Sequence, residues 1–208
     1  MPPETTAWQA LTPEAVAEQL TDLVQRRPGV VRVAVDGPPC ADAAALGAAL
    51  VDRLRHRGRH GVHVPADGFW RDRSLRYEYG REDVEGYLSW LDAGALRREV
   101  LDAAAAEHVY LPSLRDPATN RATRAEPVPL TDSAVVVVSG ALLFGLGLPF
   151  EVTVHLAVSP AARARRTPQD EQWMLAAFDE YDTTVAPAGI ADVVVKLDDP
   201  RHPAARGL

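Results

Sequence analysis

Two aspartates lie at positions where a side chain could carry out acid–base chemistry. Asp36 directly follows the β-branched run 30–35, and Asp67 comes shortly after the run 62–64. A solitary carboxylate at the end of a strand suits a general base beside a bound hydroxyl group. Each aspartate precedes a glycine, however, and an Asp-Gly pair is also common in plain turns. We therefore treat both as candidate site residues, with a turn role as the alternative.

Aromatic and basic side chains follow Asp67 closely. The rings could stack on a base or a sugar, although an aromatic residue is more often part of a core. The aromatic candidates for this substrate-binding side are Phe69, Trp70, Tyr77 and Tyr87. The basic candidates are Arg71, Arg73, Arg76 and, further along, Arg115. A second basic group could neutralise an anion or form a solvated helix face. It consists of Arg163, Arg165 and Arg166.

The turn after the first predicted strand has the position of a phosphate-binding loop but lacks its residues. In the motif G-x-x-x-x-G-K-[ST], backbone N–H groups and the lysine hold phosphate, and the hydroxyl group holds magnesium. Here aspartate replaces the second glycine, and alanines replace the lysine and the Ser/Thr. The segment consists of Gly37, Pro38, Pro39, Cys40, Ala41, Asp42, Ala43 and Ala44. The sequence thus predicts a degenerate phosphate loop.

Three residues of this loop oppose phosphate binding. Pro38 and Pro39 have no N–H group to donate. Asp42 is a good helix N-cap, worth about 1 kcal/mol, and its carboxylate would occupy the site that a helix N-terminus offers to an anion. We therefore favour a helix-capping loop over a phosphate cradle. Cys40 has no evident partner base and is not interpreted as a nucleophile.

Apolar periodicity predicts that strands and helices alternate along the chain. Strands are expected at 30–35, 62–64, 108–111, 134–138, 152–158 and 191–195. Helices are expected at 12–27, 42–57, 95–106, 160–166 and 171–183. This alternation predicts an α/β fold, a three-layer doubly wound and mainly parallel sheet that binds ligands at the carboxyl ends of its strands. We expect one domain over 1–208, with a loose tail at 1–10 and a small lid at 159–172.

Composition narrows the class of protein. The 208 residues carry a formal net charge of -7, which argues against a general nucleic-acid surface. The single cysteine excludes a disulfide framework and a multi-cysteine metal site, and no metal ligands are predicted. The N-terminus has no apolar signal core, and the apolar runs are too short to span a bilayer. We expect a cytoplasmic enzyme or binding protein, and a homodimer stays open.

The order of these segments resembles the uridine kinase-like group of P-loop nucleoside kinases. The likeness spans about residues 30 to 200 and depends on the order of several stretches rather than on one motif. These stretches are 31–54, 62–71, 76–80 with 85–87, 135–143, 159–166 and 191–195. This chain departs from the group in the degenerate phosphate loop described above, which is the Walker A loop of the group. It also has Ser139 where the group has an acid that supports magnesium.

The resemblance implies a role for several candidates. Asp67 matches the aspartate that takes the proton from the nucleoside 5′-hydroxyl group, so it would be the catalytic base. Arg163, Arg165 and Arg166 match the lid arginines that neutralise the transferring phosphate. The ligands implied are a nucleoside, a nucleotide or a phosphorylated metabolite, and the cofactors implied are ATP and magnesium.

Three functions remain open at this point. The first is an ATP:nucleoside 5′-phosphotransferase of uridine kinase type. The second is a non-catalytic descendant, a pseudokinase that binds a nucleoside or nucleotide. The third is an enzyme with different chemistry in the same cleft, using Asp36, Asp67 and the arginines. Phosphoryl transfer relies on neutralising charge with a metal ion and a lysine. The missing lysine, hydroxyl and acid therefore favour the second function, whereas the resemblance to the family favours the first, and both are kept.

Overall fold

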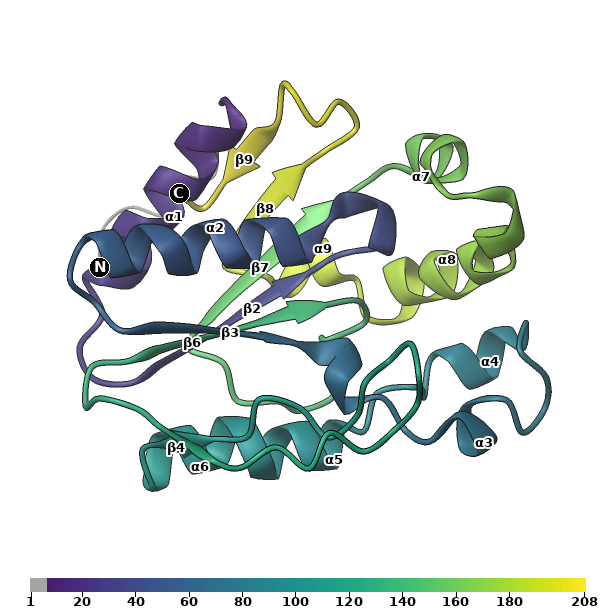
Figure 1. Cartoon of the computed structure of the whole chain (residues 1–208). Coiled ribbons are helices and arrows are strands. Elements are labelled where there is room, and N and C mark those ends of the chain that lie inside the picture. Colours follow the sequence, from purple (N-terminus) through teal and green to yellow (C-terminus); the bar gives the residue numbers. More distant parts are fainter. Residues whose placement is uncertain (1–6) are drawn as a thin grey trace.

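A computed structural model describes residues 7–208 of the chain and is built around a central sheet (Figure 1). The seven strands follow the order β1-β9-β8-β7-β2-β6-β3. Neighbouring strands from β8 to β3 are parallel, whereas β9 pairs antiparallel with both β8 and β1. Their bounds are β1 (Gln9–Ala10), β2 (Val31–Asp36), β3 (Gly61–Pro65), β6 (Val135–Gly140), β7 (Val152–Ala157), β8 (Val193–Lys196) and β9 (Ala204–Arg206). The predicted α/β fold with a mainly parallel sheet is confirmed.

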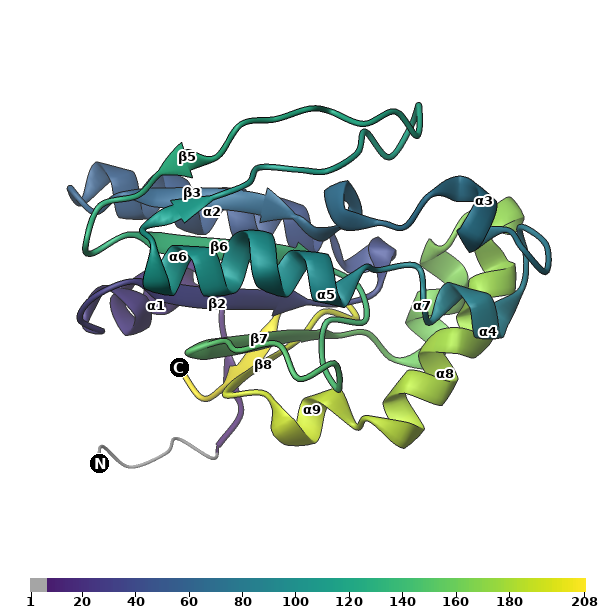
Figure 2. The same cartoon turned by 90° about the horizontal axis from the view of Figure 1, so that it is seen from below.

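Helices cover both faces of this sheet and give the predicted three layers (Figures 1 and 2). On one face lie α1 (Pro13–Gln25) and α2 (Ala43–His56). On the other face, α5 (Ala93–Leu96), η3 (Arg97–Asp102) and α6 (Ala103–Ala106) follow one another directly. A separate two-stranded ribbon joins β4 (Val109–Tyr110) to β5 (Val128–Pro129).

Two apolar cores, one on each face of the sheet, explain why the strands are near-continuous runs of valine. Val33 and Val35 of β2 pack with α1 and α2, whereas Ala34 belongs to the core on the opposite face. In β6, Val135 to Val138 are all fully buried, because a parallel sheet is covered on both faces. The sheet is therefore a rigid base for the loops at its carboxyl edge.

Short helices gather beyond the carboxyl ends of the strands, where the predicted site lies (Figure 1). After β2 and β3 come η1 (Pro39–Ala41) and η2 (Ala66–Phe69). The segment expected to be irregular, 71–87, contains α3 (Arg73–Arg76) and α4 (Val84–Tyr87). The predicted lid contains α7 (Pro160–Arg166) and the start of η4 (Gln169–Met174), which leads into α8 (Leu175–Thr184) and α9 (Pro187–Ile190).

The structure differs from the sequence prediction at both ends of the described chain. Residues 1–6 lie outside the described part, but Gln9–Ala10 pairs with Ala204–Arg206 and is not a loose tail. Neither β1 nor β9 was predicted, because two or three residues give no readable alternation. Within residues 7–208, no helix is both long and apolar enough to cross a membrane.

Candidate functional site

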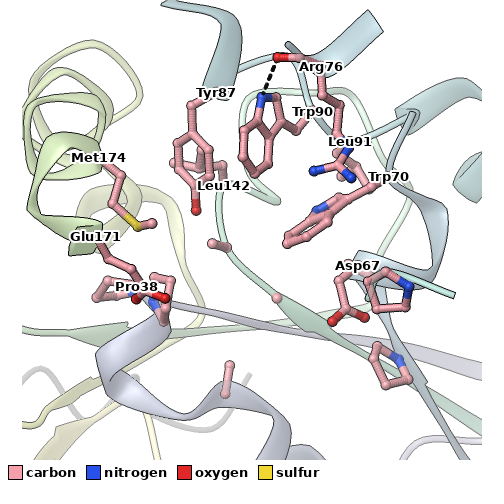
Figure 3. Close-up of a pocket in the computed structure, with 18 of the residues that line it drawn as sticks. Pro38, Asp67, Trp70, Arg76, Tyr87, Trp90, Leu91, Leu142, Glu171 and Met174 are labelled. Carbon is pink, nitrogen blue, oxygen red and sulfur yellow. Dashed lines mark hydrogen bonds between the residues drawn. The ribbon is translucent and has the colours of Figure 1, made fainter. Parts of the chain in front are cut away.

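A cavity of about 410 Å³ opens at the carboxyl ends of β2, β3 and β6 (Figure 3). Its floor is formed by the degenerate loop after β2 and by Asp67 after β3. Its upper walls come from the segment 70–91 and from η4. Of the residues predicted for the site, it contains Gly37, Pro38, Pro39, Asp42, Ala43, Ala44, Asp67, Trp70, Arg76, Tyr77 and Tyr87. Cys40 and Ala41 lie in η1 and are not part of its lining.

The degenerate loop is closed by its own hydrogen bonds. Asp42 has a left-handed backbone, with φ 54°, and its carboxylate accepts a hydrogen bond from the N–H group of Ala45 at 3.1 Å. The N–H groups of Ala41 and Asp42 donate to the carbonyl oxygens of Pro38 and Pro39 at 2.8 and 3.1 Å. A carboxylate therefore caps α2 at the place where a P-loop would hold phosphate, as the sequence predicted.

Ser139, which the resemblance aligns with a metal-supporting acid, is paired with a histidine. Ser139 at the end of β6 is buried, and its Oγ lies 2.8 Å from Nε2 of His63 on β3. Burial lowers the pKa of His63, and this outweighs the opposite effect of nearby Asp67. Gly47 of α2 gives the ring room, because a Cβ atom there would lie 2.8 Å from the same nitrogen. Sequence reasoning missed this contact.

The residues present do not fit ATP with magnesium. The loop supplies no lysine at Ala43 and no hydroxyl group at Ala44, and Asp42 brings a negative charge to the anion position. The hydroxyl group of Ser139 is already hydrogen-bonded to His63. In the described part of the chain, no group of three or more His, Cys, Asp or Glu side chains is arranged to hold a metal ion.

Asp67 is the residue expected to act as a general base. It is half-buried in η2, and its side chain lines the cavity (Figure 3). Burial raises the pKa of this carboxyl group, while backbone hydrogen bonds and His63 partly oppose the rise. A carboxylate with a raised pKa can accept a hydrogen bond, and then a proton, from a bound hydroxyl group.

An aromatic cluster forms the wall opposite the loop. Trp90 is its centre, with ring centroids 5.4 Å from Trp70, 5.5 Å from Tyr77 and 4.9 Å from Tyr87. Trp173 of η4 joins it at 5.5 Å from Tyr87. Trp90 and Trp173 were missed by the sequence analysis, as were the lining residues Arg81, Glu171 and Met174. The run of aromatic residues from 69 to 90 was the available signal for Trp90.

Five of the predicted substrate-side residues do not line this cavity. Phe69 is fully buried in the core. Asp36 is also fully buried; it accepts a hydrogen bond from the N–H group of Leu143 at 2.9 Å and lies 2.8 Å from Nδ1 of His155. The other three, Arg71, Arg73 and Arg115, are absent from the lining. Arg73 donates to the carbonyl oxygen of Ala118 at 2.9 Å, and Arg115 forms an ion pair with Asp72 at 3.0 Å.

The lid arginines also lie outside the main cavity. Arg163 is 2% exposed and forms ion pairs with Asp179 and Asp182 at 2.6 and 3.0 Å. Arg166 donates to the carbonyl oxygens of Leu197 and Cys40, and Arg165 is exposed. Through these contacts Arg163 and Arg166 fasten α7 to its neighbours. A second cavity, of about 450 Å³, includes Asp36 and Arg163 in its lining.

Comparisons with known proteins agree with the fold. No protein-family model and no curated protein matched the chain. A solved structure described as "a Possible Uridine Kinase from Bacillus stearothermophilus" superimposes with a TM-score of 0.72 and 22% identity, covering 87% of this chain and 97% of the other. A "putative fructose transport system kinase from Silicibacter sp. TM1040" superimposes with a TM-score of 0.60 and 24% identity, covering 86% of this chain and 89% of the other. The chain therefore has the fold of uridine kinase-like P-loop kinases, and at these identities the likeness concerns the fold.

Proposed function

We propose that this chain is a non-catalytic relative of the uridine kinase-like fold that binds a nucleoside, nucleotide or similar small molecule. The observation that carries this proposal is the Asp42 carboxylate on the N-terminus of α2. A negative group there repels the phosphate that a P-loop would hold, and the N–H groups of Ala41 and Asp42 are turned to Pro38 and Pro39. The protein would then bind its ligand without using magnesium-ATP.

The cavity supports a ligand with a flat ring and hydroxyl groups. Trp70, Trp90 and Tyr87 offer faces and edges on which a base or sugar can pack. Asp67 offers a carboxylate to a hydroxyl group of the same ligand. A volume of about 410 Å³ is within the range of small-molecule pockets.

Calorimetric titration of the full chain tests this proposal. ATP is titrated with and without magnesium, beside adenosine, cytidine, guanosine and uridine. We expect that magnesium does not strengthen the binding of ATP and that at least one nucleoside binds without a metal ion. Asp67→Asn should weaken that binding by about tenfold, the scale of one hydrogen bond to a charged group. Phosphorylated product in the presence of magnesium-ATP would refute the proposal.

A second candidate is a nucleoside 5′-phosphotransferase. It is favoured by the position of Asp67 in the cavity and by its raised pKa. This candidate predicts ADP formation that depends on both nucleoside and magnesium and that is lost in Asp67→Asn. An assay without ADP formation, on protein that binds nucleoside in the titration above, separates it from the first candidate.

The third function, different chemistry that uses Asp36 together with Asp67, loses its support. The side chain of Asp36 is fully buried and is hydrogen-bonded to the backbone of Leu143 and to Tyr181. It does not line the main cavity beside Asp67. The two carboxylates therefore cannot act on one ligand in that cavity.

A further inference from the structure

We infer that the ligand of the main cavity carries an anionic group, a phosphate monoester or a carboxylate, that binds Arg76. This inference rests on the proposed function and names the substrate class of the same site. It starts from the burial of Arg76, which is 5% exposed although it lines the cavity. A buried guanidinium group stays charged, so it needs a compensating partner.

Aromatic rings hold the guanidinium group in position. Its central carbon lies 4.7 Å from the ring centroid of Trp90, 5.0 Å from that of Trp70 and 5.2 Å from that of Tyr77. Its Nε atom donates to the carbonyl oxygen of Arg71 at 3.0 Å. The backbone of Arg76 in turn accepts a hydrogen bond from the Trp90 ring at 3.1 Å. The side chain is thus fixed before any ligand arrives.

The charge itself has no carboxylate partner. Among residues 7–208, no acidic side chain forms an ion pair with Arg76, and Asp72, four positions earlier, pairs with Arg115. Burial lowers the pKa of Arg76, and the neighbouring Tyr77 side chain, followed by the more distant Asp72, only partly opposes this. Cation–π contacts are weaker than a paired, hydrogen-bonded anion, so the two terminal nitrogens keep their capacity for one.

The open side of the guanidinium group faces the cavity. Figure 3 shows the guanidinium group between the rings of Trp90 and Trp70, and Asp67 lies on the same side of the cavity. A planar guanidinium group can donate two parallel hydrogen bonds to a phosphate or a carboxylate. A ligand with a hydroxyl group for Asp67 and an anion for Arg76 would satisfy both. Since Asp42 closes the phosphate loop, Arg76 is the buried cation on which an anion can dock.

Binding of matched probes to the full chain tests this inference. Uridine, uridine 5′-monophosphate, inorganic phosphate and acetate are titrated by calorimetry at one fixed ionic strength. We expect the monophosphate to bind at least about tenfold more tightly than uridine, the scale of one charge-assisted hydrogen bond. Phosphate or acetate alone should bind measurably, and the stronger of the two identifies the preferred anion.

Substitutions at Arg76, with Arg71→Gln as the control, test whether the preference for an anion arises from Arg76. Arg76→Gln should remove the tenfold preference and the binding of the free anion, whereas Arg71→Gln, which deletes an exposed charge nearby, should keep both. Arg76→Lys keeps the charge without the planar fork and should lose most of the preference, which provides a test if the glutamine variant unfolds. Anion binding that is absent, or unchanged in both Arg76 variants, would overturn the inference. Uridine binding without a preference for the monophosphate would leave the proposed function standing and refute only this step.

Discussion

Asp42 and Asp67 are both carboxylates in loops at one edge of the sheet, yet their surroundings give them different roles. Asp42 is exposed and accepts a hydrogen bond from the backbone of α2. Asp67 is half-buried, and burial raises its pKa. The first arrangement stabilises a helix, and the second keeps a carboxylate available to a ligand. Two predictions at the residue scale follow from this difference.

The raised pKa of Asp67 makes stability depend on pH. Between the ordinary aspartate pKa and the raised value, the folded protein holds a proton that the unfolded chain has released. The contribution of Asp67 to stability is therefore most favourable at low pH and declines as pH rises through the folded pKa. Asp67→Asn should raise the melting temperature at pH 7 more than at pH 3. Glu82→Gln, at an exposed carboxyl group, is the control, and an equal shift at both pH values in Asp67→Asn would contradict the prediction.

The Asp42 cap can be tested by two substitutions at one position. Asp42→Ala removes the cap and places alanine at φ 54°, which together should cost about 2 kcal/mol of unfolding free energy. Asp42→Asn keeps an acceptor and tolerates the left-handed backbone, so it should stay within about 0.5 kcal/mol of the wild type. Urea unfolding measures both values. A loss in the asparagine variant as large as in the alanine variant would rule out the cap.

Sequence predicted the Asp42 cap but not the contact between His63 and Ser139. Asp42 directly precedes an alanine-rich helix, so the cap is a local signal. His63 and Ser139 are 76 positions apart and meet only because β3 and β6 are neighbours in the sheet. The aromatic wall was predicted only in part, for the same reason. Trp173 reaches this wall from η4, which lies far along the chain.

At the scale of elements, α7 is held in place by the arginines that had been expected to act on phosphate. The helix contains three arginines within four positions, Arg163, Arg165 and Arg166, and seven residues are too few for the sequence to indicate which face is buried. The fold settles this by burying Arg163 against Phe178 of α8, with its guanidinium carbon 5.5 Å from the ring centroid. These contacts of Arg163 fasten α7 to α8.

Arg163 should therefore matter for stability. Arg163→Gln breaks the ion pairs with Asp179 and Asp182 and should lower the unfolding free energy by about 1–2 kcal/mol, a value discounted because both partners are largely exposed. Arg165→Gln, on the same helix but exposed, should change it by less than about 0.5 kcal/mol. Chemical denaturation compares the two. Equal losses would show that α7 is not anchored through Arg163.

At the scale of the whole molecule, Asp36 joins strands and helices that are distant in sequence. Its carboxylate at the end of β2 contacts His155 of β7, the backbone of Leu143 after β6, and Tyr181 of α8. Burial raises the pKa of Tyr181, so its hydroxyl group stays protonated; it donates to Asp36 at 3.2 Å and accepts from the N–H group of Phe144 at 3.0 Å. The network fixes the carboxyl edge of the sheet.

Tyr181→Phe tests this network. The change removes one oxygen atom and leaves the N–H group of Phe144 without its partner, which should cost about 1–3 kcal/mol. Tyr79→Phe makes the same chemical change at a side chain that is 80% exposed and should be nearly neutral. Thermal and urea unfolding of both variants give the comparison. A neutral Tyr181→Phe would mean that the hydroxyl group does not support the fold.

The global architecture was the part most open to prediction. Buried strands such as 134–138 and 152–158 are long β-branched runs between helices, and this alternation specifies a parallel sheet with helices on both faces. The antiparallel edge formed by β1 and β9 is short and alanine-rich, so it carries no such signal. Asp36 misled the prediction because a strand-end aspartate looks the same in sequence whether it faces a ligand or a buried histidine.

The position of the tryptophans provides a direct optical readout. Three of the four tryptophans in the chain border the main cavity, namely Trp70, Trp90 and Trp173. Trp8 lies next to Lys196, directly before the outermost strand β1. Intrinsic fluorescence therefore reports mainly on the cavity, and Trp8→Phe would remove the remaining background emission. Quenching or a spectral shift would then reveal a bound ligand without labelling, so a compound library can be screened on the unlabelled protein.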